Sequence, residues 1–143
     1  MVVVAAIDRS EGASRVVAEA DRIADRFDVP LHVVFVIDDS EHTRLIEDYA
    51  EKREPMSESV IGQIAGDVTA DAVPDGVEDY EAIGLVGDPS DRIVEYATDV
   101  DAEDIVIGGR SRSPVGKALF GSVVQSVLLE ANRPVVSVIS DRD

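Results

Sequence analysis

Short apolar runs rich in β-branched residues alternate along this chain with stretches whose apolar residues recur at helical spacing. A continuous apolar run is typical of a strand buried on both faces, and helix-length crossovers between such strands imply parallel pairing. The pattern therefore predicts a single α/β domain over residues 1–143, with a doubly wound, five-stranded parallel sheet and helices on both faces. The expected strands are Val2–Ile7, Leu31–Ile37, Val77–Val86, Asp104–Gly108 and Pro134–Ile139.

Four helical regions are expected between these strands. The first begins at a cap provided by Ser10, and its apolar stripe ends at Phe27. A weaker pattern between the second and third strands predicts helix that Pro55 breaks or restarts. The third region starts with Asp88 as its cap and Pro89 in its first helical position. An apolar stripe before the last strand predicts the fourth.

The chain contains no cysteine, which excludes a disulfide framework, a thiolate nucleophile and a cysteine-ligated metal site. No apolar run approaches the roughly 20 residues of a membrane-spanning helix. The N-terminal apolar run also lacks the basic flank and the cleavage site of a secretion signal. These observations predict a cytoplasmic protein with no membrane partner.

The formal net charge is −17, from 30 acidic and 13 basic residues, with a pI near 4.2. Such a surface repels phosphate backbones, so a nucleic-acid partner is not expected. The acidic residues are spread along the chain, and Lys52 and Lys117 are its only lysines. We interpret this composition as a halophilic surface whose self-repulsion is screened in concentrated salt.

The segment after the fourth expected strand, residues 108–122, differs from the rest of the chain. It is longer than the usual βα connection of about 2–6 residues, and it contains four glycines with Arg110, Arg112 and Lys117. Glycines let backbone N–H groups approach an anion, and a helix N-terminus together with arginines favours phosphate. The segment thus predicts phosphate binding, with a solvated loop as the alternative. It matches neither the Walker pattern nor the dinucleotide fingerprint.

The spacing within this segment resembles the nucleotide-binding loop of the universal stress protein family. That pattern is glycine, two residues, glycine, nine residues, glycine and serine or threonine. Here Gly108, Gly121 and Ser122 match, and Ser111 stands in the place of the second glycine. The resemblance extends over nearly the whole chain. It implies the strand order 3-2-1-4-5 and an adenine nucleotide, ATP or AMP, between the ends of the first and fourth strands.

The resemblance also implies roles for individual residues. Asp8 and Val36 would flank the adenosine, and Gly108 would pass close to the ribose. Ser111, Gly121 and Ser122 would hold the phosphates. The two arginines are added because of their charge. The expected nucleotide-binding residues are Asp8, Val36, Gly108, Arg110, Ser111, Arg112, Gly121 and Ser122.

Asp8 is also a candidate ligand for Mg²⁺, whereas Asp38 and Asp39 are interpreted as a solvated acidic turn. Asp8 follows a buried strand, where it could bind a metal beside a nucleotide or cap the next helix, and Ser10 already offers that cap. No nucleophile–base pair and no closely spaced carboxylate pair can be assigned, so catalysis is expected to be at most a slow ATPase activity.

The last expected strand carries apolar residues on both faces, at Val135, Val136, Val138 and Ile139. The implied strand order places it at an edge of the sheet, where an apolar strand invites pairing with another chain. The resemblance likewise implies a homodimer through this strand. The sequence thus favours a nucleotide-binding stress-response homodimer. The alternative is a stress protein without nucleotide that acts as a protein-interaction or chaperone-like dimer.

Overall fold

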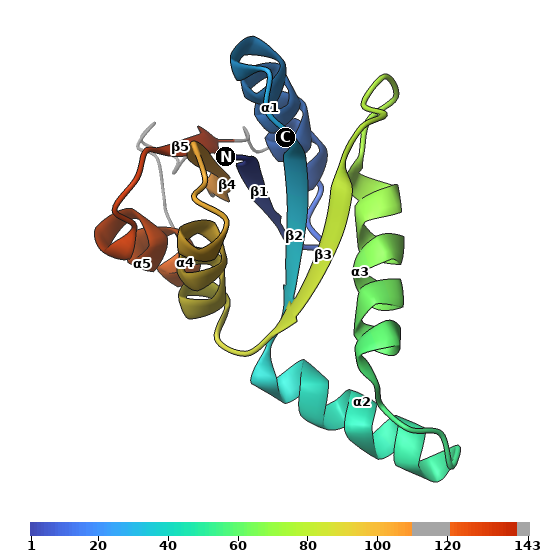
Figure 1. The fold of residues 1–143 in the computed structure, drawn as a ribbon. Coiled ribbons are helices and arrows are strands. Elements are labelled where there is room, and N and C mark those ends of the chain that lie inside the picture. Colours follow the sequence, from blue (N-terminus) through green and yellow to red (C-terminus); the bar gives the residue numbers. More distant parts are fainter. Residues whose placement is uncertain (110–120, 140–143) are drawn as a thin grey trace.

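The protein forms one five-stranded parallel sheet in a computed structural model, which describes residues 1–109 and 121–139 (Figure 1). The strand order is β3-β2-β1-β4-β5, which confirms the predicted fold and order. The strands are β1 (Val3–Ile7), β2 (Leu31–Ile37), β3 (Glu81–Val86), β4 (Asp104–Gly109) and β5 (Val135–Ile139). The helices are α1 (Ala13–Phe27), α2 (Asp39–Glu51), α3 (Glu58–Ala72), α4 (Pro89–Asp99) and α5 (Ser122–Glu130).

Strand β1 is the centre of the sheet. It pairs in parallel with β2 on one side, where Val3 lies opposite Leu31, and with β4 on the other, where Val3 lies opposite Asp104. All five residues of β1 are buried, because neighbouring strands flank it and helices cover both of its faces. The continuous apolar run at the N-terminus therefore has the environment that its composition predicts.

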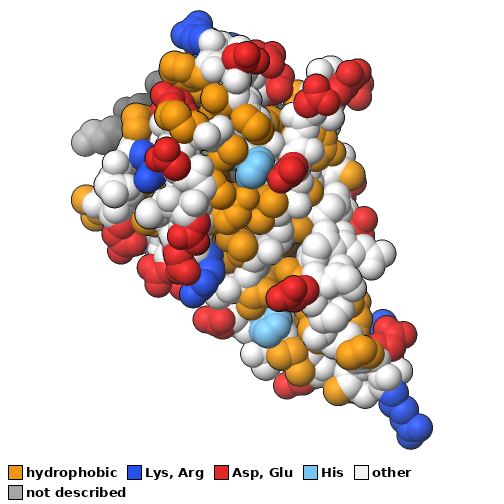
Figure 2. Space-filling model, viewed as in Figure 1, with side chains coloured by type: hydrophobic (Ala, Val, Ile, Leu, Met, Phe, Trp, Pro, Cys, Tyr) orange, Lys and Arg blue, Asp and Glu red, His pale blue; other side chains and the backbone are white. Residues whose placement is uncertain are grey.

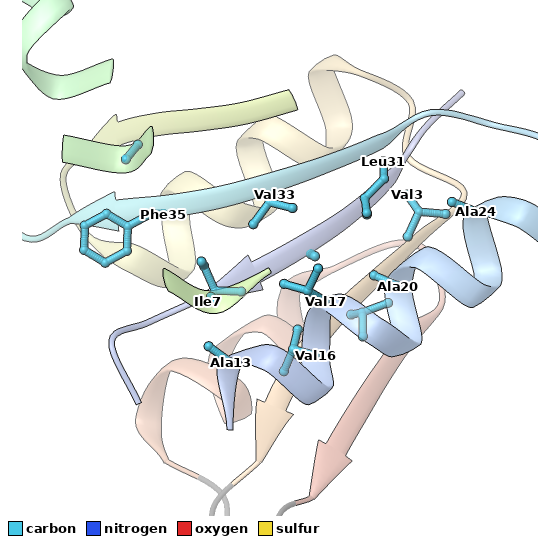
Figure 3. Packing of buried hydrophobic residues seen from close by; sticks show 14 of the residues in the cluster. Val3, Ile7, Ala13, Val16, Val17, Ala20, Ala24, Leu31, Val33 and Phe35 are labelled. Carbon is cyan, nitrogen blue, oxygen red and sulfur yellow. The ribbon is translucent and has the colours of Figure 1, made fainter. Parts of the chain in front are cut away.

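Two core clusters lie on opposite faces of the sheet. One packs α1 and α3 against the sheet, and Figure 3 shows Val16, Val17 and Ala20 of α1 directed toward the strand residues Val33 and Ile7. The other packs α4 and α5 against the alternate residues of the same strands. This alternation follows from the two-residue repeat of a strand, which sends successive side chains to opposite faces.

The structure corrects the predicted start of the first helix. Helix α1 begins at Ala13, its cap is Gly12, and no side chain bonds to its first turn, so Ser10 is not the cap. The backbone N–H of Ser10 instead donates to Oδ1 of Asp8 at 2.9 Å. This local bond favours a turn after β1, and the helix starts two residues later than predicted. Phe27, the end of the predicted stripe, is 49% exposed.

The third strand is shorter than predicted. It begins at Glu81, and residues 77–80 precede it without strand pairing. The N–H of Val77 donates to the carbonyl of Pro74, which closes a turn there. Glu78 and Asp79 are residue types that are depleted in strands, and the pairing begins after them, at Glu81.

Residues 38–73 form two helices where the prediction had one interrupted region. Helix α2 ends at Glu51 and α3 begins at Glu58, so the predicted break around Pro55 is confirmed. Helix α2 extends away from the sheet and buries none of its residues (Figure 1). Helix α3 returns against β3, where a Cβ on Gly84 would lie 2.8 Å from the carbonyl oxygen of Ile61. A glycine is therefore required for this close helix–strand approach.

Candidate functional site

The carboxyl ends of β1 and β4 lie side by side, because the two strands pair in parallel with Ala6 opposite Ile107. Asp8 and Gly108 each follow this pair within two residues, so the register brings both to the same edge of the sheet. The chain changes its winding direction at this point, since β1 connects to β2 on one side while β4 lies on the other. Open α/β sheets bind ligands at such a switch point.

Asp8 is exposed at this edge. Its Oδ1 accepts the N–H of Ser10 at 2.9 Å, so the carboxylate holds the turn that leads from β1 to α1. The prediction assumed that Ser10 would relieve Asp8 of a structural role, and that assumption is wrong. A carboxylate acceptor can take several hydrogen bonds, so the turn leaves Asp8 capacity to bind a ligand group.

Val36 is half-buried one residue before the end of β2, and it packs at the margin of the core cluster under α4 and α5. Gly108 is the second-last residue of β4, and a Cβ added to it would lie 3.2 Å from Cγ2 of Val16 in α1. The missing side chain of Gly108 therefore serves the packing of α1 against β4. This is a structural requirement that the sequence pattern alone did not reveal.

Helix α5 begins at Ser122 with Gly121 as its cap, and Gly121 has no side chain that could cap the first turn. No acidic residue lies in that turn either. Helices α2 and α4 differ, because Asp38 and Asp88 accept backbone N–H groups of their first turns. Those backbone hydrogen bonds lower the pKa of both carboxyl groups. The predicted cap at Asp88 is thereby confirmed.

The backbone N–H groups and the positive end of the dipole at the start of α5 suit an anion. The predicted residues Arg110, Ser111 and Arg112 lie outside the described residues. The structure thus brings Asp8 and Gly108 to one edge of the sheet and caps α5 with Gly121.

Arg9 is a charged residue at this edge to which the sequence analysis gave no role. Its Nη2 lies 2.6 Å from Oε1 of Glu41 in α2, and its guanidinium lies 4.7 Å from the ring centroid of Phe35. The hydrogen bond to Glu41 raises the pKa of Arg9. The side chain is therefore held by α2 and β2. No local sequence signal predicts this contact, which depends on the placement of α2.

A cavity of about 210 Å³ opens beside Asp8 on the side of α1 and α3. Its lining combines charged and apolar groups from the end of β1, the start of α1 and the C-terminal half of α3. The residues are Asp8, Arg9, Ser10, Ala13, Val68, Asp71 and Ala72. The contribution of α3 was missed, because it depends on how two helices distant in sequence pack together.

Within residues 1–109 and 121–139, no group of three or more histidine, aspartate or glutamate side chains could hold a metal ion. Asp8 and Asp71 are the carboxylates among the residues that line the cavity. Magnesium ions are commonly bound through one or two carboxylates plus substrate phosphates and water. The described side chains alone therefore form no metal cage.

Residues 1–138 match the model of the Universal stress protein family. The chain belongs to this family. The predicted resemblance is thereby confirmed over nearly the full length of the chain.

Two relatives show how far the family likeness extends. A "Universal stress protein" from Mycolicibacterium smegmatis is 36% identical in an alignment that covers 61% of this chain and 78% of that protein. The solved universal stress protein from Archaeoglobus fulgidus is 31% identical, with a TM-score of 0.62, and the match covers 96% of this chain and 97% of that one.

A third relative contains a nucleotide. It is a universal stress protein from Archaeoglobus fulgidus in complex with dAMP, 26% identical with a TM-score of 0.58. The match covers 96% of both chains. A member of the family with this fold therefore binds an adenine nucleotide.

No helix in the described part of the present chain is long and apolar enough to cross a membrane.

Proposed function

We propose that this universal stress protein binds an adenine nucleotide, ATP or AMP, at the carboxyl edge of β1 and β4. The observation that carries the proposal is the uncapped start of α5, beyond the end of β4, in a family whose member binds dAMP. Phosphate oxygens would accept hydrogen bonds from the backbone N–H groups of the first turn of α5. The proposed role is a cytoplasmic one in the stress response.

The adenosine would lie between Asp8 and Val36. Asp8 is exposed at the end of β1, and its carboxylate can accept hydrogen bonds from ribose hydroxyls or from an amino group of the base. Val36 offers a half-buried apolar surface one strand away, next to β1 in the sheet. Gly108 would approach the ribose from β4.

The phosphates would lie over the start of α5. Gly121, the cap of α5, and Ser122, its first residue, would offer backbone N–H groups and a hydroxyl there. Ser111, Arg110 and Arg112 belong to the segment between β4 and α5, and we propose that they complete the phosphate site. If Mg²⁺ accompanies the nucleotide, Asp8 is its proposed protein ligand, and the phosphates would supply further oxygens.

Isothermal titration calorimetry in concentrated salt tests the proposal. We expect heat of binding and a stoichiometry of one nucleotide per chain with ATP, AMP or both. GTP serves as the control for base recognition, because it shares the phosphates of ATP. If neither ATP nor AMP gave heat of binding, the proposal would be contradicted. That result would favour a stress protein that acts through protein contacts.

We also propose that the protein forms a homodimer through β5. This strand lies at the edge of the sheet, and none of its five residues is fully buried. Val136 and Val138 pack partly against the core under α1, whereas Val135 packs on the opposite face. Ile139 completes the apolar edge. Two such edges would pair their free backbone groups and bury apolar side chains of both copies.

Val138→Lys is expected to convert this dimer to a monomer, because the added charges would repel each other across the two-fold axis. Sedimentation equilibrium in concentrated salt measures the mass directly. Ile46→Lys introduces the same charge on α2, at an exposed side chain, and should leave the dimer intact. A wild-type mass equal to that of one chain would contradict the proposed interface.

A further inference from the structure

Arg92 is a basic residue at the start of α4 that has no role in the nucleotide site proposed above. Its backbone N–H donates to the carbonyl of Asp88 at 2.9 Å, which places Arg92 in the first turn of the helix. Figure 2 shows basic side chains scattered singly among acidic ones on the face that carries α4, β2 and β3. The contacts of this cation show what it could bind.

The side chain of Arg92 packs over Gly87, the residue that follows β3. A Cβ on Gly87 would lie 2.9 Å from Nε of Arg92 and 3.2 Å from its Cγ, so the side chain occupies space that a larger residue would fill. The N–H of Gly87 donates to the carbonyl of Ile37, the last residue of β2, at 3.0 Å. The Nε atom of Arg92 therefore lies beside the carboxyl ends of β2 and β3.

The Nε–H of Arg92 is a donor without an acceptor. The Nε atom is shielded from solvent, and no group among residues 1–109 and 121–139 accepts its hydrogen. A buried donor without a partner is unfavourable. The far end of the guanidinium is held only by Glu95, with Nη1 3.3 Å from Oε1, and the two side chains are 42% and 55% exposed. Such a surface pair contributes little, so Arg92 retains donors for a further acceptor.

Val36 links this side chain to the proposed nucleotide site. In the register of β2 and β3, Val36 lies opposite Leu85, one residue before the Ile37 carbonyl that binds Gly87. Val36 also packs on the face of the sheet that α4 covers. The proposed phosphates lie on the other side of β1, at the start of α5. A nucleotide extended between these two places would direct its base, and not its phosphates, toward Arg92.

We propose that Arg92 recognises the purine base through one of its ring nitrogens, an inference that rests on the proposed nucleotide site. The Nε–H donates a hydrogen bond to that nitrogen. A guanidinium has donors and no acceptor, so it cannot bind the amino group of adenine, which Asp8 can accept. The cation beside the base also favours its π system. Arg92 and Asp8 would thus read opposite kinds of groups on the same base.

Arg92→Gln tests the contact by removing the guanidinium while keeping a polar side chain. We expect calorimetry in concentrated salt to show an ATP affinity at least about tenfold lower than that of the wild type. The melting temperature should not fall, because the variant removes an unpaired buried donor. Arg22→Gln is the matched control, since Arg22 pairs with Glu19 of its own helix at the same spacing, and it should leave the affinity unchanged.

Arg92→Lys separates recognition of the base from a general effect of charge. Lysine keeps the positive charge but lacks the planar guanidinium and its Nε–H donor. We therefore expect Arg92→Lys to bind ATP as weakly as Arg92→Gln does. Full recovery of the affinity in Arg92→Lys would overturn the proposal, because charge alone would then account for the role of Arg92.

The 1-deaza, 3-deaza and 7-deaza analogues of ATP identify the acceptor, because each replaces one ring nitrogen with a C–H group. We expect one analogue to bind the wild type at least about tenfold more weakly than ATP does. Arg92→Gln should bind that analogue and ATP with equal affinity, since the two changes remove the same hydrogen bond. A loss that persists in Arg92→Gln, or no loss with any analogue, would contradict the proposal.

Failure of this inference is distinguishable from failure of the proposed function. If Arg92→Gln bound ATP as tightly as the wild type, Arg92 would not contact the base, and the nucleotide site would stand without it. An equal loss with Arg22→Gln would have the same meaning for Arg92. If the wild type bound neither ATP nor AMP, the nucleotide site itself would be refuted, and the role of Arg92 with it.

Discussion

Gly121→Val is expected to abolish nucleotide binding while leaving the fold intact. The backbone of Gly121 has φ −71° and ψ 168°, an extended conformation that valine adopts readily. The branched side chain would occupy the space in front of the first N–H groups of α5, where we place the phosphates. A loss of about 100-fold in affinity corresponds to about 2.8 kcal/mol. Calorimetry with ATP and AMP measures it.

Two further variants separate this effect from a change in stability. Gly121→Asp supplies a side chain that can cap α5, so the helix should be as stable as in the wild type or slightly more so. Its negative charge should nevertheless repel the phosphates and abolish binding. Gly62→Val, in an open position on α3, is the matched glycine control and should bind normally. Undiminished binding by Gly121→Asp would contradict the placement of the phosphates.

Removing salt is expected to destabilise the protein strongly. The net charge of −17 is spread over the surface, and its mutual repulsion is weakened when the Debye length falls from about 10 Å at 0.1 M salt to about 3 Å at 1 M. We expect the melting temperature to rise by at least about 10 °C over this range, which for a domain of this size corresponds to a few kcal/mol. Circular dichroism with KCl at both concentrations measures it.

A charge variant tests whether repulsion causes this dependence. Glu47 and Asp67 are exposed on α2 and α3. Replacing both with lysine makes the net charge less negative without touching the core. The double variant should melt at a higher temperature than the wild type in low salt, and the difference should shrink in concentrated salt. A melting temperature that does not depend on salt in either protein would refute the halophilic interpretation.

The helices and strands could be predicted because apolar runs and helix-start residues are both local signals in the sequence. Buried parallel strands such as β1 require continuous apolar runs, and Asp88 followed by Pro89 carries the chemistry of a helix start in two residues. The order of the strands came from the family resemblance, since periodicity alone does not specify which strands are neighbours. The errors arose where a local hydrogen bond competed with a pattern, as between Asp8 and Ser10.

The candidate site was less predictable, because its parts depend on tertiary contacts. The carboxyl edge and the glycine at the start of α5 followed from motif spacing and topology. The contact of Arg9 with Glu41 and the cavity beside α3 depend on how helices pack after folding, and no short motif encodes this. Gly108 illustrates a second difficulty, since its proximity to Val16 gives it a packing role that its place in a binding motif conceals.

The position of β1 also has a consequence for synthesis. Strand β1 is made before the other four strands of the sheet and becomes its middle, yet its second neighbour, β4, begins only at Asp104. The N-terminal half can assemble β1, β2 and β3 early, but one apolar side of β1 stays unpaired until most of the chain has been made. The proposed nucleotide site lies between β1 and β4, so a nascent chain can acquire affinity for the nucleotide only when these two strands have paired.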